Sequence, residues 1–189
     1  LRRPIHFAFS YDEEVGCRGV AGMIEKIAAR TPLPHACIVG EPTSMRAVTA
    51  HKGIRAFETA ILGREAHSSN TEFGVSAIMA AGRLIGFLAG LLEEMKARGD
   101  SSGRFDPPYT SLNVGTVEGG TAVNIVPNHC RLVWEYRPLP QADEDEILAR
   151  FEAFAREVEA EMRVRFDGAA IVTTQIARER KKSSSLRSQ

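Results

Sequence analysis

Residues 54–92, "IRAFETAILGREAHSSNTEFGVSAIMAAGRLIGFLAGLL", place a strand pattern, a polar loop and a long helical pattern in direct succession. In residues 54–63 apolar and polar side chains alternate in places, which is typical of a strand with one solvated face. Further on, apolar and small residues recur at intervals of three and four, as on one face of a helix. We expect this face to be buried: Val75, Ile78, Met79, Gly82, Ile85, Gly86, Ala89 and Leu92.

Two more strands and a second helix are expected downstream. Residues 110–120, "TSLNVGTVEGG", and 130–140, "CRLVWEYRPLP", have strand patterns with a turn region between them. Residues 169–177, "AAIVTTQIA", suit a last strand. Residues 143–163 follow the helical period, and we expect this helix to bury the stripe Ile147, Phe151, Phe154, Val158 and Met162. The resulting order predicts a ferredoxin-like α+β domain, an antiparallel four-stranded sheet with two helices.

The N-terminal part has a different, α/β pattern. Residues 4–10, "PIHFAFS", and 35–40, "HACIVG", are short apolar runs on either side of a helical pattern at 19–30. Strand, helix and strand with short joins predict a parallel, right-handed crossover unit. One such unit cannot cover both faces of a sheet, so we expect it to be part of a larger α/β domain.

We therefore divide the chain into three parts. Residues 1–50 are expected to be a partial α/β catalytic domain, and 51–177 a complete ferredoxin-like domain inserted into it. Residues 178–189, basic and serine-rich, are expected to be disordered.

Composition narrows the classes of partner. Lysine and arginine (24) balance aspartate and glutamate (24), and no basic stripe is interleaved with aromatics. We therefore expect a small-molecule ligand, with no nucleic acid and no membrane. The odd number of cysteines, without metal-ligand spacing, favours a reducing compartment, so we expect a cytoplasmic protein.

Carboxylates follow both expected N-terminal strands. "SYDEEVG" carries Asp12, Glu13 and Glu14, and "GEPTS" carries Glu41. Parallel neighbouring strands would bring these groups to one sheet edge, where a divalent cation would offset their mutual repulsion. A solvated loop, or the acidic first turn of a helix, is the alternative for the "DEE" run, and an ordinary turn is the alternative for Glu41.

Three more polar residues are candidates. His67 lies in the polar loop before the long helix, Asn124 in a Gly-Gly turn region, and Arg137 near a strand end. Arg137 could bind a carboxylate through two hydrogen bonds, and Asn124 could orient a polar group of a substrate. The alternative for His67 is an ordinary surface histidine, for Asn124 a turn residue, and for Arg137 a surface arginine. For His51 the ordinary interpretation is a hinge residue near the domain boundary.

Taken together, six short motifs resemble the M20 metallopeptidase family, most closely its acetylornithine deacetylase branch. In chain order they are "SYDEEVG", "IVGEPTS", "AHKG", "GREAHSS", "GGTAVNIVP" and "EYRPLP". The resemblance implies a zinc-dependent hydrolase of N-acetylornithine or a related N-acyl amino acid. It also implies a catalytic domain with two zinc (or cobalt) ions and a lid domain through which subunits form a homodimer.

The resemblance further implies residue roles. Glu13 is the general base that takes a proton from a metal-bridging water, and Glu14 and Glu41 each bind one metal. His67 reaches the partner subunit's active site to stabilise the oxyanion, while Asn124 and Arg137 lie near the transition state and the substrate carboxylate.

The chain also departs from the family pattern. Family members carry further metal ligands, upstream of "DEE" and far downstream, that have no counterpart here. We therefore expect this chain alone to hold no complete two-metal site and to be inactive. The alternative function is that of a non-catalytic dimerisation module built from the lid domain.

Overall fold

The computed structural model describes residues 4–14, 17–30, 33–48, 50–179 and 182–183. The chain divides into two compact units, Leu1–Arg46 and Ala47–Gln189. Each unit is described by itself.

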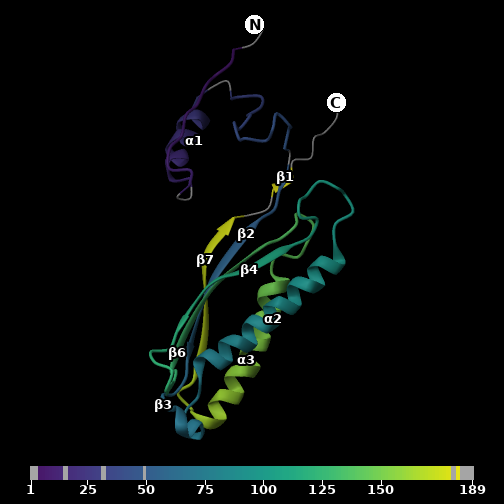
Figure 1. The fold of residues 1–189 in the computed structure, drawn as a ribbon. Helices are drawn as coiled ribbons and strands as arrows, with labels where there is room; N and C mark the ends of the chain where they lie inside the picture. The colour runs from purple at the N-terminus through teal and green to yellow at the C-terminus, as the bar shows by residue number, and fades with distance from the viewer. Residues whose placement is uncertain (1–3, 15–16, 31–32, 49, 180–181, 184–189) are drawn as a thin grey trace. The chain divides into compact units, whose positions relative to one another are not determined.

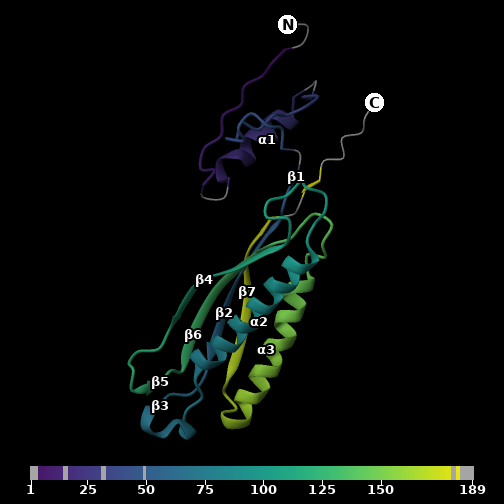
Figure 2. The ribbon, with the colours of Figure 1, turned by 45° about the vertical axis from the view of Figure 1, so that its right-hand side comes forward.

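The second unit is a sheet covered on one face by two helices (Figures 1 and 2). The strand order is β4-β6-β2-β7, and every neighbouring pair is antiparallel. The expected ferredoxin-like arrangement is therefore confirmed. The elements in chain order are β2 (Ile54–Leu62), α2 (Ala77–Arg98), β4 (Ser111–Gly119), β6 (His129–Arg137), α3 (Glu146–Arg165) and β7 (Ala170–Glu179).

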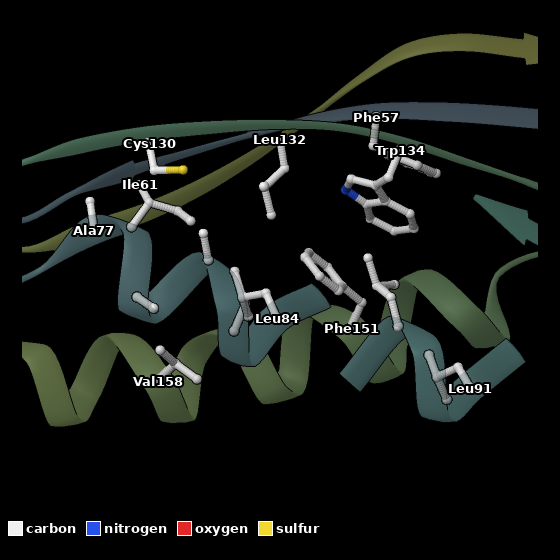
Figure 3. Close-up of a cluster of buried hydrophobic side chains, with 14 of the residues drawn as sticks. Phe57, Ile61, Ala77, Leu84, Leu91, Cys130, Leu132, Trp134, Phe151 and Val158 are labelled. Atoms are coloured by element: carbon white, nitrogen blue, oxygen red, sulfur yellow. The ribbon is translucent and has the colours of Figure 1, made fainter. Parts of the chain in front are cut away.

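The core lies between the sheet and the helices (Figure 3). Alternate residues of β2 and β6 face the helices, and Phe57 stacks on Trp134 with ring centroids 4.7 Å apart. Trp134 also packs against Phe151 of α3, at 4.5 Å. Its indole Nε1 donates a hydrogen bond of 3.0 Å to Oγ1 of Thr59. The polar atoms of this aromatic cluster are therefore satisfied inside the core.

The buried face of α2 is not the expected one. Of the expected stripe only Val75, which precedes the helix, is buried; Ile78 and Met79 are 39% and 73% exposed. The sequence pattern is ambiguous because α2 has apolar or small residues on more than one side. The helical spacing of these residues therefore does not determine which face is buried. The residues that α2 buries are Ala77, Ala80, Ala81, Leu84, Leu88, Leu91 and Met95.

Helix α3 buries most of its expected stripe. Ile147, Phe151, Val158 and Met162 are buried. Phe154 instead lies between the helices, where its ring stacks on Phe87 at 4.4 Å.

Ion pairs flank this aromatic contact between α2 and α3. Arg83 makes two hydrogen bonds to the carboxylate of Glu161, at 2.6 and 2.9 Å. Arg150 binds Glu94 in the same way, at 2.8 and 2.9 Å. The seam between the two helices is therefore closed by contacts within the domain itself.

Small elements lie at the two ends of the sheet (Figure 2). At one end β3 (Ala66–His67) pairs with β5 (Ile125–Val126), and the 3-10 helix η2 (Ser68–Phe73) follows β3. At the other end β1 (Ala50–His51) pairs with β8 (Lys182–Ser183).

The first unit departs from the expected crossover. The helix forms, as η1 (Arg18–Val20) and α1 (Ala21–Ala28), but no described residue at 4–10 or 35–40 belongs to a strand. A strand exists only when a neighbour pairs with its backbone, and none does so in the described residues of this unit. Side chains that a sheet would bury are exposed, including Phe7 at 83%, Phe9 at 88% and Ile38 at 96%.

The end of the chain also differs from expectation. β7 continues to Glu179, past the expected boundary at 177, because its backbone pairs with β2 as far as Ile54. Lys182–Ser183 form β8, and the other residues of the expected disordered tail lie outside the described residues. In the part of the chain that the structure describes, no helix has both the length and the apolar character to cross a membrane.

Candidate active site

The acidic motif of the first unit lies in exposed turns. Asp12, Glu13 and Glu14 are exposed, and the carbonyl of Glu13 accepts a hydrogen bond from the amide of Cys17 at 3.0 Å. Glu41 is also exposed, and its carbonyl accepts from Thr43 N at 2.8 Å. The expected convergence at a sheet edge depends on two strands that do not form here, so the joint role of these groups stays a prediction.

The described residues do not by themselves supply the donors of a two-metal centre. Among the described residues, no group of three or more His, Cys, Asp or Glu side chains is close enough together to hold a metal ion. A tetrahedral zinc site takes at least three protein ligands. The two carboxylates expected as ligands, Glu14 and Glu41, are therefore too few, and no chemical step is derived through a metal here.

His67 has a defined position at one end of the second unit. Its backbone lies in β3, opposite Ile125 of β5, and the amide of Ser68 donates to the carbonyl of Asn124 at 2.9 Å. The imidazole Nδ1 accepts a hydrogen bond from the amide of Ser69 at 3.1 Å, so His67 caps η2 with its own ring. The Oγ of Ser69 also lies 2.7 Å from Nδ1.

The structure therefore brings two of the candidates together at one corner. His67 lies in β3 and Asn124 directly precedes β5, the strand that pairs with β3; the hydrogen bond from Ser68 joins the two segments, and both side chains are exposed. This exposure leaves both accessible to a bound molecule. Val123, beside Asn124, is fully exposed as well.

Arg137 lies at the opposite end of the sheet. It is the last residue of β6, whose first residue, His129, pairs with Leu62 at the end near His67. Eight residue steps of about 3.3 Å separate His129 from Arg137, so Arg137 lies about 26 Å along β6 from His129, at the far end of the strand from the corner. Arg137 is exposed, and its Nε donates to Glu135 at 3.1 Å.

Lys52 lies beside this second end, and sequence reasoning missed it. Its Nζ donates to the carbonyls of Pro107 and Tyr109, at 2.6 and 2.8 Å. Burial lowers the pKa of Lys52; the charge of Asp106 opposes this effect and that of Arg137 adds to it. Only the position of Lys52 within the motif "AHKG" could have drawn attention to it.

Sequence reasoning also missed the contact made by Ser69. The long helix α2 is capped by Ser76, whose Oγ accepts from Met79 N at 3.2 Å. Ser69 instead holds the ring of His67. A serine two residues after a histidine is too common a pattern to reveal such a contact.

Comparison with known proteins gives the family. Residues 49–163 match the family model described as the peptidase dimerisation domain of M20 proteins. Acetylornithine deacetylase of Myxococcus xanthus is 37% identical over 158 residues, which are 84% of this chain and 40% of that protein. Acetylornithine deacetylase of Salmonella arizonae is 36% identical over 140 residues, 74% of this chain and 36% of that protein. The chain thus spans well under half the length of these relatives.

Solved structures agree with the fold. A Burkholderia cenocepacia protein described as an amidohydrolase/peptidase is similar with a TM-score of 0.55 and 27% identity, over 70% of this chain and 29% of that one. The aminopeptidase PepT of Bacillus cereus is similar with a TM-score of 0.55 and 23% identity, over 75% of this chain and 33% of that one. The family match covers more than half of the chain and includes the whole four-stranded sheet except its last strand. The chain therefore belongs to the M20 peptidase family and carries its dimerisation domain.

Proposed function

We propose that the chain is part of a metal-dependent amide hydrolase that deacetylates N-acetylornithine or a related N-acyl amino acid in the cytoplasm. The observation that carries this proposal is the similarity to acetylornithine deacetylases, which runs over 84% of the chain. On this proposal residues 1–50 belong to the catalytic domain and residues 51–177 are the lid. Glu13 would act as general base, and Glu14 and Glu41 as ligands to a two-zinc centre completed by residues outside this chain.

The geometry of His67 supports a role as a hydrogen-bond donor. A backbone amide can only donate, so the bond from Ser69 N requires Nδ1 to be an acceptor. In the neutral ring the proton is then on Nε2, which can donate to the oxyanion that forms when an amide is attacked. Asn124, held beside His67, would supply a second polar contact.

The separation of the two ends supports action by two subunits. Arg137 ends β6, about 26 Å along the strand from His129, whereas His67 and Asn124 lie near the end where His129 is. One lid therefore cannot present all three side chains to one small acyl amino acid. We propose that Arg137 binds the substrate carboxylate in one subunit, while His67 and Asn124 reach the substrate held by the partner subunit.

A homodimer also matches an apolar surface of the lid. Ile78 is exposed, and a Cβ built on Gly120 would lie 3.1 Å from its Cδ1, so Ile78 lies against the end of β4. On the same flank of α2, at 100° per residue, follow Gly82, Ile85 and Ala89. β4 is the edge strand on this side of the sheet. We call Ile78, Gly82, Ile85, Ala89 and the outer edge of β4 the flank surface.

The opposite flank of α2 is closed by its ion pairs and aromatic contact with α3, so the flank surface is the better candidate for a second copy. Exposed strand edges and apolar faces are what a partner chain covers. The proposed dimer uses this surface.

Hydrolysis of N-acetylornithine by the complete gene product tests the proposed activity. We expect release of acetate, and loss of that release in Glu13→Gln, which keeps the size of the side chain but cannot take a proton. Glu25→Gln on α1 is the matched control and should keep activity. Undiminished turnover in Glu13→Gln would overturn the assignment of the base.

A dimerisation module without catalysis is the second candidate. It is supported by the match of residues 49–163 to the dimerisation-domain model. Among the described residues, moreover, no group of three or more His, Cys, Asp or Glu side chains could hold a metal ion. Turnover of N-acetylornithine by the complete gene product distinguishes the candidates, since neither places a complete zinc site in the 189-residue chain. A dimeric chain whose complete gene product is inactive supports the module, whereas hydrolysis would contradict it.

A further inference from the structure

The contact between Ser69 and His67 has a chemical consequence beyond capping. Two groups of Ser69 meet one ring nitrogen: its amide lies 3.1 Å and its hydroxyl oxygen 2.7 Å from Nδ1 of His67. The hydroxyl alone could donate or accept, because its hydrogen rotates. The amide removes this freedom, since it makes Nδ1 an acceptor and therefore makes the hydroxyl a donor as well.

An exposed imidazole without such contacts exchanges its proton between the two nitrogens. His67 is exposed, so burial does not choose the tautomer. Its backbone, by contrast, is fixed by the pairing of β3 with β5 and by the bond from Ser68 N to Asn124 O. The ring is thus joined to a fixed strand through its Cα–Cβ and Cβ–Cγ bonds, and Ser69 holds the side of the ring that carries Nδ1.

We propose that Ser69 is a positioning residue that fixes His67 as the tautomer protonated on Nε2. The inference about the tautomer concerns only this chain. Its value for catalysis rests on the proposed function, in which Nε2 must donate to an oxyanion. A proton on Nδ1 would leave Nε2 as an acceptor, which repels a developing negative charge.

Nitrogen-15 spectra of the 189-residue chain test the tautomer directly. Protonated and unprotonated ring nitrogens differ widely in chemical shift, and the spectrum is recorded at a pH where the rings are neutral. The chain has five histidines, and the signals of His67 are those missing from His67→Gln. We expect a single pattern with the proton on Nε2. A proton on Nδ1, or an averaged pattern, would overturn the proposal.

Three variants test the part played by the hydroxyl. In Ser69→Ala we expect a measurable population protonated on Nδ1, because only the amide contact is left. Ser69→Thr keeps a hydroxyl and should restore the wild-type pattern. Ser68→Ala is the matched control, since the contact of Ser68 with this corner runs through its backbone amide. An unchanged pattern in Ser69→Ala would show that the side chain is dispensable.

Kinetics of the complete enzyme test separately whether the contact between Ser69 and His67 matters for catalysis. Loss of one neutral hydrogen bond to His67 should lower kcat about three- to tenfold in Ser69→Ala, with KM within about twofold, and Ser69→Thr should recover it. A rise in KM with unchanged kcat would contradict the positioning role. If the complete protein hydrolyses no N-acyl amino acid, the proposed function fails, whereas the spectra still decide the tautomer.

Discussion

Trp134 and Thr59 are joined by a hydrogen bond of 3.0 Å between the indole Nε1 and Oγ1, inside the core of the second unit. They belong to neighbouring strands, β6 and β2. The hydroxyl of Thr59 also lies 3.0 Å from that of Thr173 on β7. One hydroxyl thus links three of the four strands of the sheet, β6, β2 and β7.

Replacing this hydroxyl should destabilise the domain without changing its shape. Thr59→Val keeps the volume of the side chain but leaves the buried indole N–H without its partner. We expect the free energy of unfolding to fall by about 1–3 kcal/mol. Urea unfolding followed by the fluorescence of Trp134, the single tryptophan of the chain, measures the change.

Two variants control for other effects of the substitution at Thr59. Thr59→Ser keeps the hydroxyl and should lose less stability than Thr59→Val. Thr174→Val, at an exposed position of β7, should change stability by less than about 0.5 kcal/mol. Equal losses in Thr59→Val and Thr174→Val would mean that the indole contact contributes nothing.

The proposed dimer depends on the flank surface. Ile78→Glu puts a charge where two apolar surfaces are expected to meet, and burying it without a partner is costly. We expect the variant to be a monomer at concentrations at which the wild-type chain is a dimer, as measured by light scattering after gel filtration. Val164→Glu, at an equally apolar but more exposed position of α3, should stay dimeric. The flank surface is the wrong interface if Ile78→Glu also stays dimeric.

Tyr136 should make stability depend on pH in the alkaline range. Burial raises its pKa from 10.0 to about 12, and its hydroxyl donates to the carbonyl of Glu144 at 2.6 Å. The raised pKa means that the folded state favours the neutral phenol. The stabilisation is complete below pH 10 and is lost as pH rises from about 10 to about 12.

The difference between wild type and Tyr136→Phe isolates this effect. Both proteins contain the same other alkaline groups, so the gap between their free energies of unfolding should shrink from pH 9 towards pH 12. Tyr11→Phe, at an exposed tyrosine, should follow the wild-type curve. A gap that stays constant across this range would contradict the buried neutral state.

The sheet could be predicted from sequence because each strand and helix signals its own type. The expected strand 54–63 and the expected helix 143–163 agree with β2 and α3 to within a few residues. The buried face of α2 could not be predicted, since Ile78, Ile85 and Leu92 are as apolar as Leu84 and Leu88. The sheet beneath α2 decides which face of the helix is buried in the domain. In our proposal, a second copy of the chain covers another face.

The candidate site was less predictable from the sequence than the sheet. His67 and Asn124 come together through strand pairing between residues 58 positions apart or more, which a local pattern does not encode. The strands at 4–10 and 35–40 were expected from their apolar side chains. A strand, however, also needs neighbouring backbone, and the described residues of the first unit provide none.

Lys52 provides the last prediction, because it ties the loop before β4 to the start of β2. The loop carbonyls of Pro107 and Tyr109 accept both of its hydrogen bonds, and the amide of Gly53 donates to Pro138 O at 3.0 Å beside the end of β6.

Lys52→Met keeps the length of the side chain and removes its donors. The amides of Asp106, Tyr109 and Thr110 should then exchange with deuterium about tenfold faster or more, since two charge-assisted bonds are lost. Lys26→Met, at an exposed position of α1, should leave these rates unchanged. Equal rates in the wild type and Lys52→Met would mean that the loop is held by its other contacts, such as the bond from Leu139 N to Thr110 Oγ1.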